Sequence, residues 1–300
     1  MLIILVVLGH FVGSGYHFAS PESQKLLHNV FIWIYMFHMP AFFWLAGLLW
    51  KDNSGTWCDF LLRKARRLLI PYFVFGLMSI VAYVLLETVF AYMARDAVDE
   101  FYVAKSASSI WLYMLSLFHG GGWPNGTGFQ MNAALWFLPC MFSCLVAFRL
   151  IMRIGIRKYR VALALFLYLF SFLLRKFNII SLPFGIHKAP YFLAFMIIGH
   201  DVRLKDFSIA SIIVFCLYSG ICWNMPDPYW GQNFVGWYLV YFLLALAGIY
   251  FTSCLSHRLL LKPLRLCGQY SLFIMLSHKF PMILLQYLVA KIRRDNMNGG

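Results

Sequence analysis

The chain has 300 residues, a net charge of +14 at neutral pH, and a composition that is 62% hydrophobic and only 12% charged. A soluble domain is about 45–50% apolar and about 25% charged, and the apolar residues here extend along the whole length, so a soluble protein is excluded. The Lys and Arg residues lie mostly in short loops between apolar segments, which the positive-inside rule explains without nucleic acid. We therefore expect a polytopic protein whose partner is the lipid bilayer and not a nucleic acid.

Nine apolar segments are candidates for membrane helices. A helix needs about 20 residues to cross a hydrocarbon core about 30 Å thick. The segments are 1–13, 29–50, 68–93, 132–152, 160–174, 182–199, 207–223, 235–254 and 267–290. The first is short and begins inside an apolar run, so we expect the N-terminal helix to be truncated. The chain is thus predicted to be all-α, with nine to ten transmembrane helices in a single domain over residues 1–300.

The distribution of Lys and Arg predicts which loops are cytoplasmic. Segments 51–67, 149–160, 200–206 and 256–266 hold fifteen such residues, whereas the loops on the opposite side hold six. Cytoplasmic loops carry the excess of positive charge, so the first set is predicted to be cytoplasmic in a multi-pass protein of the plasma (inner) membrane. Basic residues at 291, 293 and 294 then fall on the outer side, which indicates either a last helix beyond this sequence or a wrong count of the spans.

Three histidines lie within predicted spans, namely His10, His38 and His278. A polar ring in the hydrocarbon core is costly unless it faces a cavity or a partner. Histidine suits acid–base chemistry because its unperturbed pKa is about 6.5. A membrane histidine also serves as a hydrogen bond between helices, so both interpretations stay open for each ring. Pro40 follows His38 closely and frees a backbone carbonyl, which makes this stretch the first candidate for a site.

Lys279 lies near the centre of segment 267–290, about a dozen residues from either end. Snorkelling does not easily bring an ammonium group to water from that depth. We expect Lys279 to face a cavity or a partner, with Pro281 opening the helix beside it. The alternative is that the span is placed wrongly and the residue lies at a surface.

A basic cluster, Arg63 to Arg67, precedes the third span. Guanidinium groups match phosphate oxygens, so the cluster is a candidate clamp for a charged cytoplasmic donor. Binding of anionic lipid head groups explains the same charges. The seven cysteines form no C-x-x-C pair, and no carboxylate pair lies within a span. We expect no metal and no bound cofactor.

Several short motifs follow one another along the chain. They are VLGH at 7–10, FHMPAFFWLAG at 37–47, RKARRLLIPY at 63–72, LWFLP at 135–139 and GQYSLFIMLSH at 268–278. In this order they resemble acyltransferase family 3 of integral membrane proteins, and most of all its fucose 4-O-acetylase-like branch. The motifs extend over nearly the whole chain. The set is specific for the family and not for a substrate.

The resemblance implies about ten transmembrane helices and an O-acyltransferase activity. An acyl group, often acetyl, would pass from cytoplasmic acyl-CoA, the donor substrate, to a hydroxyl of an extracytoplasmic carbohydrate or glycan-lipid acceptor. The histidine of the first motif would be the catalytic base or an acyl relay, and the basic motif would bind acyl-CoA. The expected site residues are His10, His38, Arg63, Arg66, Arg67, Trp136, His278 and Lys279.

Two other functions fit the same residues. Histidine and lysine at mid-membrane depth also occur in secondary transporters of small polar solutes. Substrate uptake without consumption of acyl-CoA would identify such a transporter. In addition, the family usually carries a basic residue eleven positions before His10, and that position precedes Met1. A truncated, non-catalytic membrane protein is therefore the second alternative.

Overall fold

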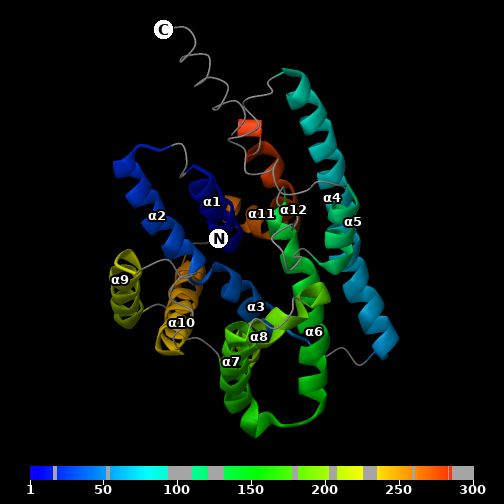
Figure 1. Ribbon diagram of the computed structural model, residues 1–300. Coiled ribbons are helices and arrows are strands. Elements are labelled where there is room, and N and C mark those ends of the chain that lie inside the picture. The colour runs from blue at the N-terminus through cyan, green and yellow to red at the C-terminus, as the bar shows by residue number, and fades with distance from the viewer. Residues whose placement is uncertain are drawn as a thin grey trace. The chain divides into compact units, whose positions relative to one another are not determined.

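The computed structural model describes residues 1–15, 19–51, 55–93, 110–120, 132–177, 182–202, 208–225, 235–258, 261–282 and 284–285. Every regular element within these residues is a helix, which confirms the predicted all-α class (Figure 1). Contacts along the chain divide it into two compact units. The first unit comprises Met1–Asp52, Ile151–Asn178 and Pro190–Met275, and the second comprises Asn53–Leu150, Ile179–Ala189 and Leu276–Gly300.

Four helical stretches of the described residues are long and apolar enough to cross a membrane. They are Pro21–Leu48, Trp57–Ala82, Ala134–Arg153 and Tyr238–Ser256. These stretches correspond to the second, third, fourth and eighth predicted spans. Two shorter apolar helices, Leu2–Gly13 and Ile209–Trp223, fall on the first and seventh. The total of nine to ten spans stays a prediction.

The first unit begins with α1 (Leu2–Gly15), which lies beside α2 (Pro21–Tyr35) in Figure 1. Gly9 faces α2, since a Cβ atom built on it would lie 3.0 Å from the ring of Tyr35. Gly13, one turn further along, also faces a side chain of α2 at 3.0 Å. Small residues at this spacing let two membrane helices approach closely.

A break separates α2 from α3 (His38–Leu48). Pro40 has no N–H to donate to the carbonyl of Met36, so a continuous helix through this point would leave that acceptor without its bond. The chain instead turns at Met36 and Phe37, where the Phe37 N–H donates to the carbonyl of Ile34. The predicted span 29–50 is therefore two helices joined by a turn.

Two glycines let α3 cross α8 (Ala189–Asp201) at backbone contact. A Cβ atom on Gly47 would lie 1.9 Å from the carbonyl oxygen of Met196. A Cβ atom on Gly199 would lie 2.1 Å from the carbonyl oxygen of Trp44. Any larger residue at either position would have to move a backbone.

Hydrogen-bonded aromatic residues join α7 (Arg160–Lys176) to α10 (Val235–Arg258). The Tyr168 hydroxyl donates to the carbonyl of Tyr238 over 2.6 Å, and the Tyr238 hydroxyl lies 2.6 Å from Ser171 Oγ. These polar atoms are buried among aromatic rings and satisfy one another, which removes the cost of burying them.

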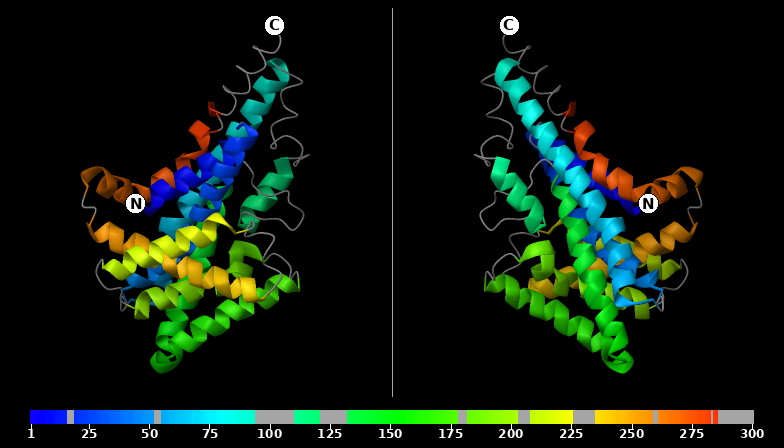
Figure 2. Two further views of the ribbon diagram at one scale, coloured as in Figure 1. Left: turned by 90° about the vertical axis from the view of Figure 1, so that its left-hand side faces the viewer. Right: turned by 90° about the vertical axis from the view of Figure 1, so that its right-hand side faces the viewer.

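The helix α9 (Ile209–Trp223) packs on α10 and on α2, and the left view in Figure 2 shows α9 beside α10. Trp33 of α2 donates its indole N–H to Ser219 Oγ over 3.0 Å. The Tyr218 hydroxyl in turn donates to the carbonyl of Trp33.

An ion pair joins α7 to α8. At the start of α7, Arg160 pairs with Asp201 at the end of α8, with an N–O distance of 3.1 Å.

The predicted span 267–290 contains short helices in its described part. The helix α11 is Lys262–Gln269 and α12 is Ser271–Ser277. The next residue, His278, lies in a turn. The predicted helix opening ahead of Pro281 is thus present, and residues 286–290 of the predicted span lie outside the described residues.

The second unit is built from α4 (Trp57–Met93), α5 (Ile110–His119) and α6 (Phe137–Arg153). Tyr72 of α4 donates its hydroxyl to the carbonyl of Leu117 in α5 over 2.7 Å. Two 3-10 segments complete the described part. The segment η3 (Ala133–Trp136) precedes α6, and η5 (Pro183–Lys188) packs on α6.

We expect Gly47→Ala to lower the stability of the protein by about 1–3 kcal/mol, because the added methyl group overlaps the backbone of α8. The thermal unfolding midpoint of the purified protein in detergent measures the effect. Gly220→Ala in α9 is the matched control, since a Cβ atom there has nothing within 4 Å, and alanine is the better helix former. Equal midpoints for the two variants would contradict the proposed crossing.

Candidate functional site

The break between α2 and α3 positions His38. The imidazole Nδ1 lies 3.0 Å from the carbonyl oxygen of Ile34, on the last turn of α2. Because a carbonyl only accepts, Nδ1 must carry the hydrogen, and the lone pair of the neutral ring is then on Nε2. His38 is buried, with 2% of its surface exposed. The turn therefore fixes both the tautomer and the direction of this ring.

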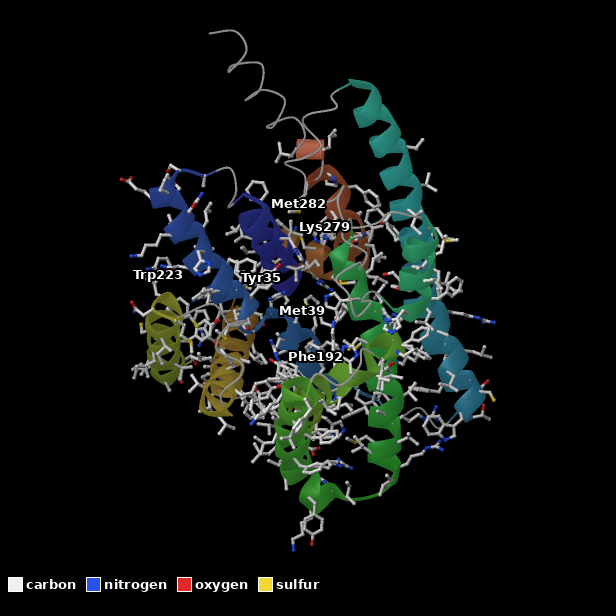
Figure 3. The ribbon with its side chains drawn as sticks, in the orientation of Figure 1. Tyr35, Met39, Phe192, Trp223, Lys279 and Met282 are labelled. Carbon is white, nitrogen blue, oxygen red and sulfur yellow. The ribbon has the colours of Figure 1, made fainter. Side chains whose placement is uncertain are left out.

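Tyr35 lies between His38 and His10. The Tyr35 hydroxyl is 3.0 Å from Nδ1 of His10, which α1 supplies. The Tyr35 ring also contacts His38, with 4.6 Å between ring centroids. Stacking on Phe31 at 3.8 Å holds the tyrosine ring in place. Figure 3 labels Tyr35 at the end of α2, beside α1. The structure thus brings two predicted site residues together around one tyrosine.

Sequence reasoning missed Tyr35. Tyrosine is common near the ends of membrane spans, so its presence in 29–50 carried little signal. Its position three residues before His38 was the available clue, since residues at i and i+3 share a helix face. The turn at Met36 changes that geometry, and only the fold shows that His10 reaches the same hydroxyl.

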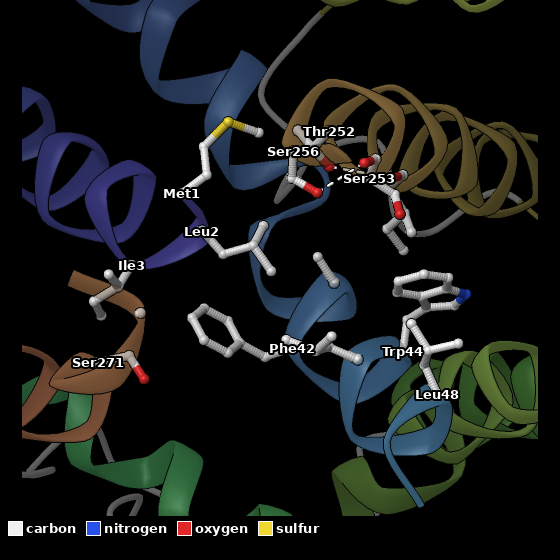
Figure 4. Close-up of a pocket in the computed structure, with 14 residues that line it drawn as sticks. Met1, Leu2, Ile3, Phe42, Trp44, Leu48, Thr252, Ser253, Ser256 and Ser271 are labelled. Atoms are coloured by element: carbon white, nitrogen blue, oxygen red, sulfur yellow. Dashed lines mark hydrogen bonds between the residues drawn. The ribbon is translucent and has the colours of Figure 1, made fainter. Parts of the chain in front are cut away.

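A cavity of about 370 Å³ opens in the first unit, next to the start of α1 (Figure 4). Its walls are mostly apolar side chains of α1 and α3, such as Ile3 and Phe42. Hydroxyls of Thr252, Ser253 and Ser256 on α10 add a polar edge. Small-molecule sites are usually concave, mostly apolar and equipped with a few polar groups of this kind.

The α1 wall of this cavity leads toward His10. Ile3 lines the cavity, and His10 follows it by seven residues, which returns to nearly the same face of an α-helix. Seven residues also advance the helix by about 10 Å. A ligand in the cavity therefore lies about two turns of α1 from the His10–Tyr35–His38 cluster.

The predicted basic cluster lies in the second unit, near the start of α4. Arg63, Arg66 and Arg67 are all exposed, and their spacing places them on one face of the helix. Thr56 caps this helix, since its hydroxyl accepts the Asp59 N–H at 3.1 Å and donates to the Asp59 carboxylate at 2.6 Å. The three guanidinium groups are thus presented together at a fixed helix end.

Arg149 of α6 holds that helix end, although its sequence position suggested only a cytoplasmic loop charge. Its side chain is 1% exposed, and the guanidinium donates to the carbonyls of Gly55 (2.6 Å) and Thr56 (3.3 Å). The same group lies over the rings of Trp57 and Phe60, 4.7 and 4.4 Å from their centroids. Carbonyls and aromatic faces together compensate a buried cation.

The predicted cavity residue Trp136 contacts a lysine that the sequence did not single out. The Nζ atom of Lys188, at the end of η5, lies 4.5 Å from the centroid of the Trp136 ring. Trp136 is half-buried. The segment η5 lies outside the four candidate spans, and burial there lowers the pKa of Lys188.

The predicted residues His278 and Lys279 follow the break after α12. His278 is buried and Lys279 is half-buried. Asn132 holds the helix end before them, because its amide donates to the carbonyl of Leu276 over 2.9 Å. That carbonyl is among the last four of α12, which have no partner within the helix. Asn132 and Leu276 both belong to the second unit, whereas His10 and His38 belong to the first.

The described residues contain no group of three or more His, Cys, Asp or Glu side chains that could hold a metal ion. The polar chemistry of the first unit rests on imidazole and phenol groups, and that of the second unit on guanidinium and ammonium groups. Together with four candidate spans, these groups indicate a helical membrane protein with a histidine–tyrosine cluster in its first unit.

Comparison with known proteins identifies the family to which the chain belongs. A family model described as an acyltransferase domain matches residues 1–298. The chain therefore belongs to acyltransferase family 3, as its ordered motifs indicated, and is a membrane acyltransferase. Its resemblance to the fucose 4-O-acetylase-like branch stays a prediction. No curated protein and no solved structure matches the chain.

We expect Arg149→Met to loosen the start of α4, because the carbonyls of Gly55 and Thr56 lose a charged donor. Hydrogen bonds to charged groups contribute about 1.5–3 kcal/mol, so trypsin should cleave after Arg63, Arg66 or Arg67 roughly tenfold faster. The cleavage rate in detergent measures this change. The matched control is Arg153→Met, four residues further along α6 and exposed. An unchanged rate in Arg149→Met would show that Arg149 does not hold the helix end.

Proposed function

We propose that the protein is an O-acyltransferase that moves an acyl group, acetyl in the simplest case, from cytoplasmic acyl-CoA to a hydroxyl of an extracytoplasmic carbohydrate or glycan-lipid. The observation that carries the proposal is the 3.0 Å contact between His10 Nδ1 and the Tyr35 hydroxyl, with His38 beside the same ring. A sugar hydroxyl is a poor nucleophile at neutral pH. A positioned base that removes its proton contributes about 10²–10⁴-fold to the rate.

In the direct reaction, the acceptor hydroxyl attacks the thioester carbonyl while His10 takes the hydroxyl proton. The new bond joins the acceptor oxygen to the acyl carbon, and the bond from that carbon to the CoA sulfur breaks. The proton then passes from the imidazolium to the departing thiolate and gives free CoA. A relay through an acyl-histidine would use the same ring in two transfers. In both routes the base needs a lone pair directed at the substrate.

Tyr35 can supply that orientation. If Nδ1 of His10 donates its hydrogen to the Tyr35 oxygen, the lone pair of the neutral ring lies on Nε2, away from the tyrosine. His38 has the same tautomer for a different reason, because its Nδ1 donates to a backbone carbonyl. We assign His10 the role of base and His38 that of a second polar wall of the same cluster.

Two separate features support the donor side of the proposal, namely the cavity in the first unit and the basic helix end in the second. The cavity next to Ile3 has the size and mixed lining suited to an acyl group with part of a pantetheine arm. In the predicted orientation, its walls on α3 and α10 are next to the cytoplasmic loops 51–67 and 256–266. Arg63, Arg66 and Arg67 are the candidate partners for the CoA phosphates.

Membranes that contain the protein test the proposal directly. After incubation with labelled acetyl-CoA, label should appear in an ester-linked form on surface glycan. Uptake of a solute into vesicles without consumption of acetyl-CoA would instead identify a transporter. Membranes that neither transfer label nor take up solute would favour a non-catalytic protein.

We expect His10→Ala to lower acyl transfer by at least about a hundredfold, because the reaction loses its base. The rate of label transfer, divided by the amount of protein in the membrane, measures the effect. His28→Ala is a suitable control, because His28 lies in α2 but outside the cluster. Full activity of the His10→Ala variant would refute the assigned role.

We expect Tyr35→Phe to lower the rate about tenfold, the effect of one hydrogen bond that orients the base. The ring contacts with Phe31 and His38 remain in this variant, so only the hydroxyl is tested. Tyr250→Phe removes another hydrogen-bonded hydroxyl of the first unit, 3.2 Å from Ser211 Oγ, and is the matched control. The role of Tyr35 would be disproved by equal rates in the two variants.

A further inference from the structure

The pair formed by Lys188 and Trp136 has no role in the chemistry proposed for His10. Lys188 places its ammonium group 4.5 Å from the Trp136 ring centroid. Among the described residues, no carboxylate pairs with this ammonium. A cation on an aromatic face keeps part of its charge uncompensated, since the ring offers only a quadrupole. The pair is therefore positioned to accept a negative charge.

The backbone that carries Lys188 is rigidly held. Phe184 has a φ of 55°, a left-handed conformation that is unfavourable for a bulky residue. The Ser143 hydroxyl donates to the Phe184 carbonyl over 3.0 Å, and Gly185 packs against Cys140 of α6. Strained residues persist only where their surroundings over-determine them, and they concentrate at ligand sites.

His187 lies beside Lys188 in the chain and brings no negative charge to the pair. Burial lowers the pKa of His187, and the neighbouring charges of Lys188 and His119 lower it further. His187 and Lys188 share η5, at the start of the predicted span 182–199. Because segment 200–206 is predicted to be cytoplasmic, this end of the span is predicted to be extracytoplasmic. A positive site on that side can meet the acceptor and not the cytoplasmic donor.

We propose that Lys188 and Trp136 form a subsite for the carboxylate of an acidic sugar in the acceptor glycan. The proposal rests on the proposed function for the identity of the ligand as an acceptor. A uronic acid fits both residues, because its carboxylate can pair with the ammonium of Lys188 and its C–H face can stack on the indole ring of Trp136. Binding of the carboxylate draws the ammonium away from the ring, and the ring face is then available for the sugar.

The alternative occupant is the head group of an anionic lipid in the outer leaflet. A lipid phosphate would also pair with Lys188. It would not need a flat aromatic face beside the cation, nor a backbone held at one orientation. The half-buried ring of Trp136 therefore favours the sugar, and the test below separates the two.

Binding of an oligogalacturonate to the purified full chain tests the subsite without acyl-CoA. The protein is placed in nanodiscs of neutral lipid, and isothermal titration calorimetry compares this probe with its carboxyl-reduced counterpart, an oligogalactose. We expect the acidic probe to bind at least about tenfold more tightly, the effect of one charge-assisted hydrogen bond. High salt should reduce this preference, because screening weakens the ion pair. Equal affinity for the two probes in the unmodified protein would overturn the proposal.

Substitutions assign the preference to Lys188. Lys188→Met should lower the affinity for oligogalacturonate about tenfold, and Lys188→Arg should restore most of it. Lys176→Met removes an exposed lysine at the end of α7, from the same predicted extracytoplasmic loop (175–188), and should not change the affinity. A preference that survives Lys188→Met would overturn the assignment. The assignment would also be overturned if Lys188→Met kept its affinity for oligogalacturonate but retained less phosphatidylglycerol than the unmodified protein. The pair would then be a lipid site.

The two proposals can fail separately. If the protein binds the acidic probe more tightly than the neutral one but no label passes from acetyl-CoA to any glycan, the proposed transfer reaction is wrong and the carboxylate subsite is supported. If label passes to acidic and neutral glycans equally and both probes bind equally, the transfer reaction stands and the subsite is wrong.

Discussion

The arrangement of the first unit depends on one constraint, which is that a backbone acceptor inside a membrane must find a donor within the protein. Pro40 removes one donor from the middle of a membrane stretch, and the chain turns at Met36 and Phe37. The imidazole of His38 then donates to the carbonyl of Ile34. A single side chain thereby satisfies the interrupted helix and becomes part of a polar cluster. The end of α2, where Tyr35 lies, is set by the same break.

Much of the fold could be predicted because membrane helices are selected by local properties. The length of an apolar run decides whether it can span, so the all-α class and four of the spans follow from the sequence alone. The cost of burying ionisable groups likewise singled out His10 and His38. The pairing of these rings through Tyr35 depends on helix packing, and the hydropathy of a segment does not indicate which helices it packs against. The short helices within 267–290 depend on the same long-range contacts.

Two cations show most clearly what composition leaves undetermined. Counting charges treats Arg149 and Lys188 as equivalent loop residues. The structure buries the guanidinium of Arg149 between two rings, and two of its nitrogens donate to backbone carbonyls. Lys188 has only one ring beneath its ammonium. The first cation is held by backbone carbonyls and two rings and has a structural role, whereas the second is the cation of the proposed carboxylate subsite.

The contact of α3 with α8 has a mechanical consequence. Because the backbones meet at Gly47 and Gly199, the two helices are packed as closely as their backbones allow, which favours their moving together. At the turn, the Met36 N–H keeps its helical bond to Ile32, but the Phe37 N–H bonds to Ile34, and Pro40 has no N–H to donate to Met36. Bending of the stretch is therefore concentrated at that turn, which acts as a hinge. Such bending would change the distance between Tyr35 and His38, and so open or close the proposed catalytic cluster.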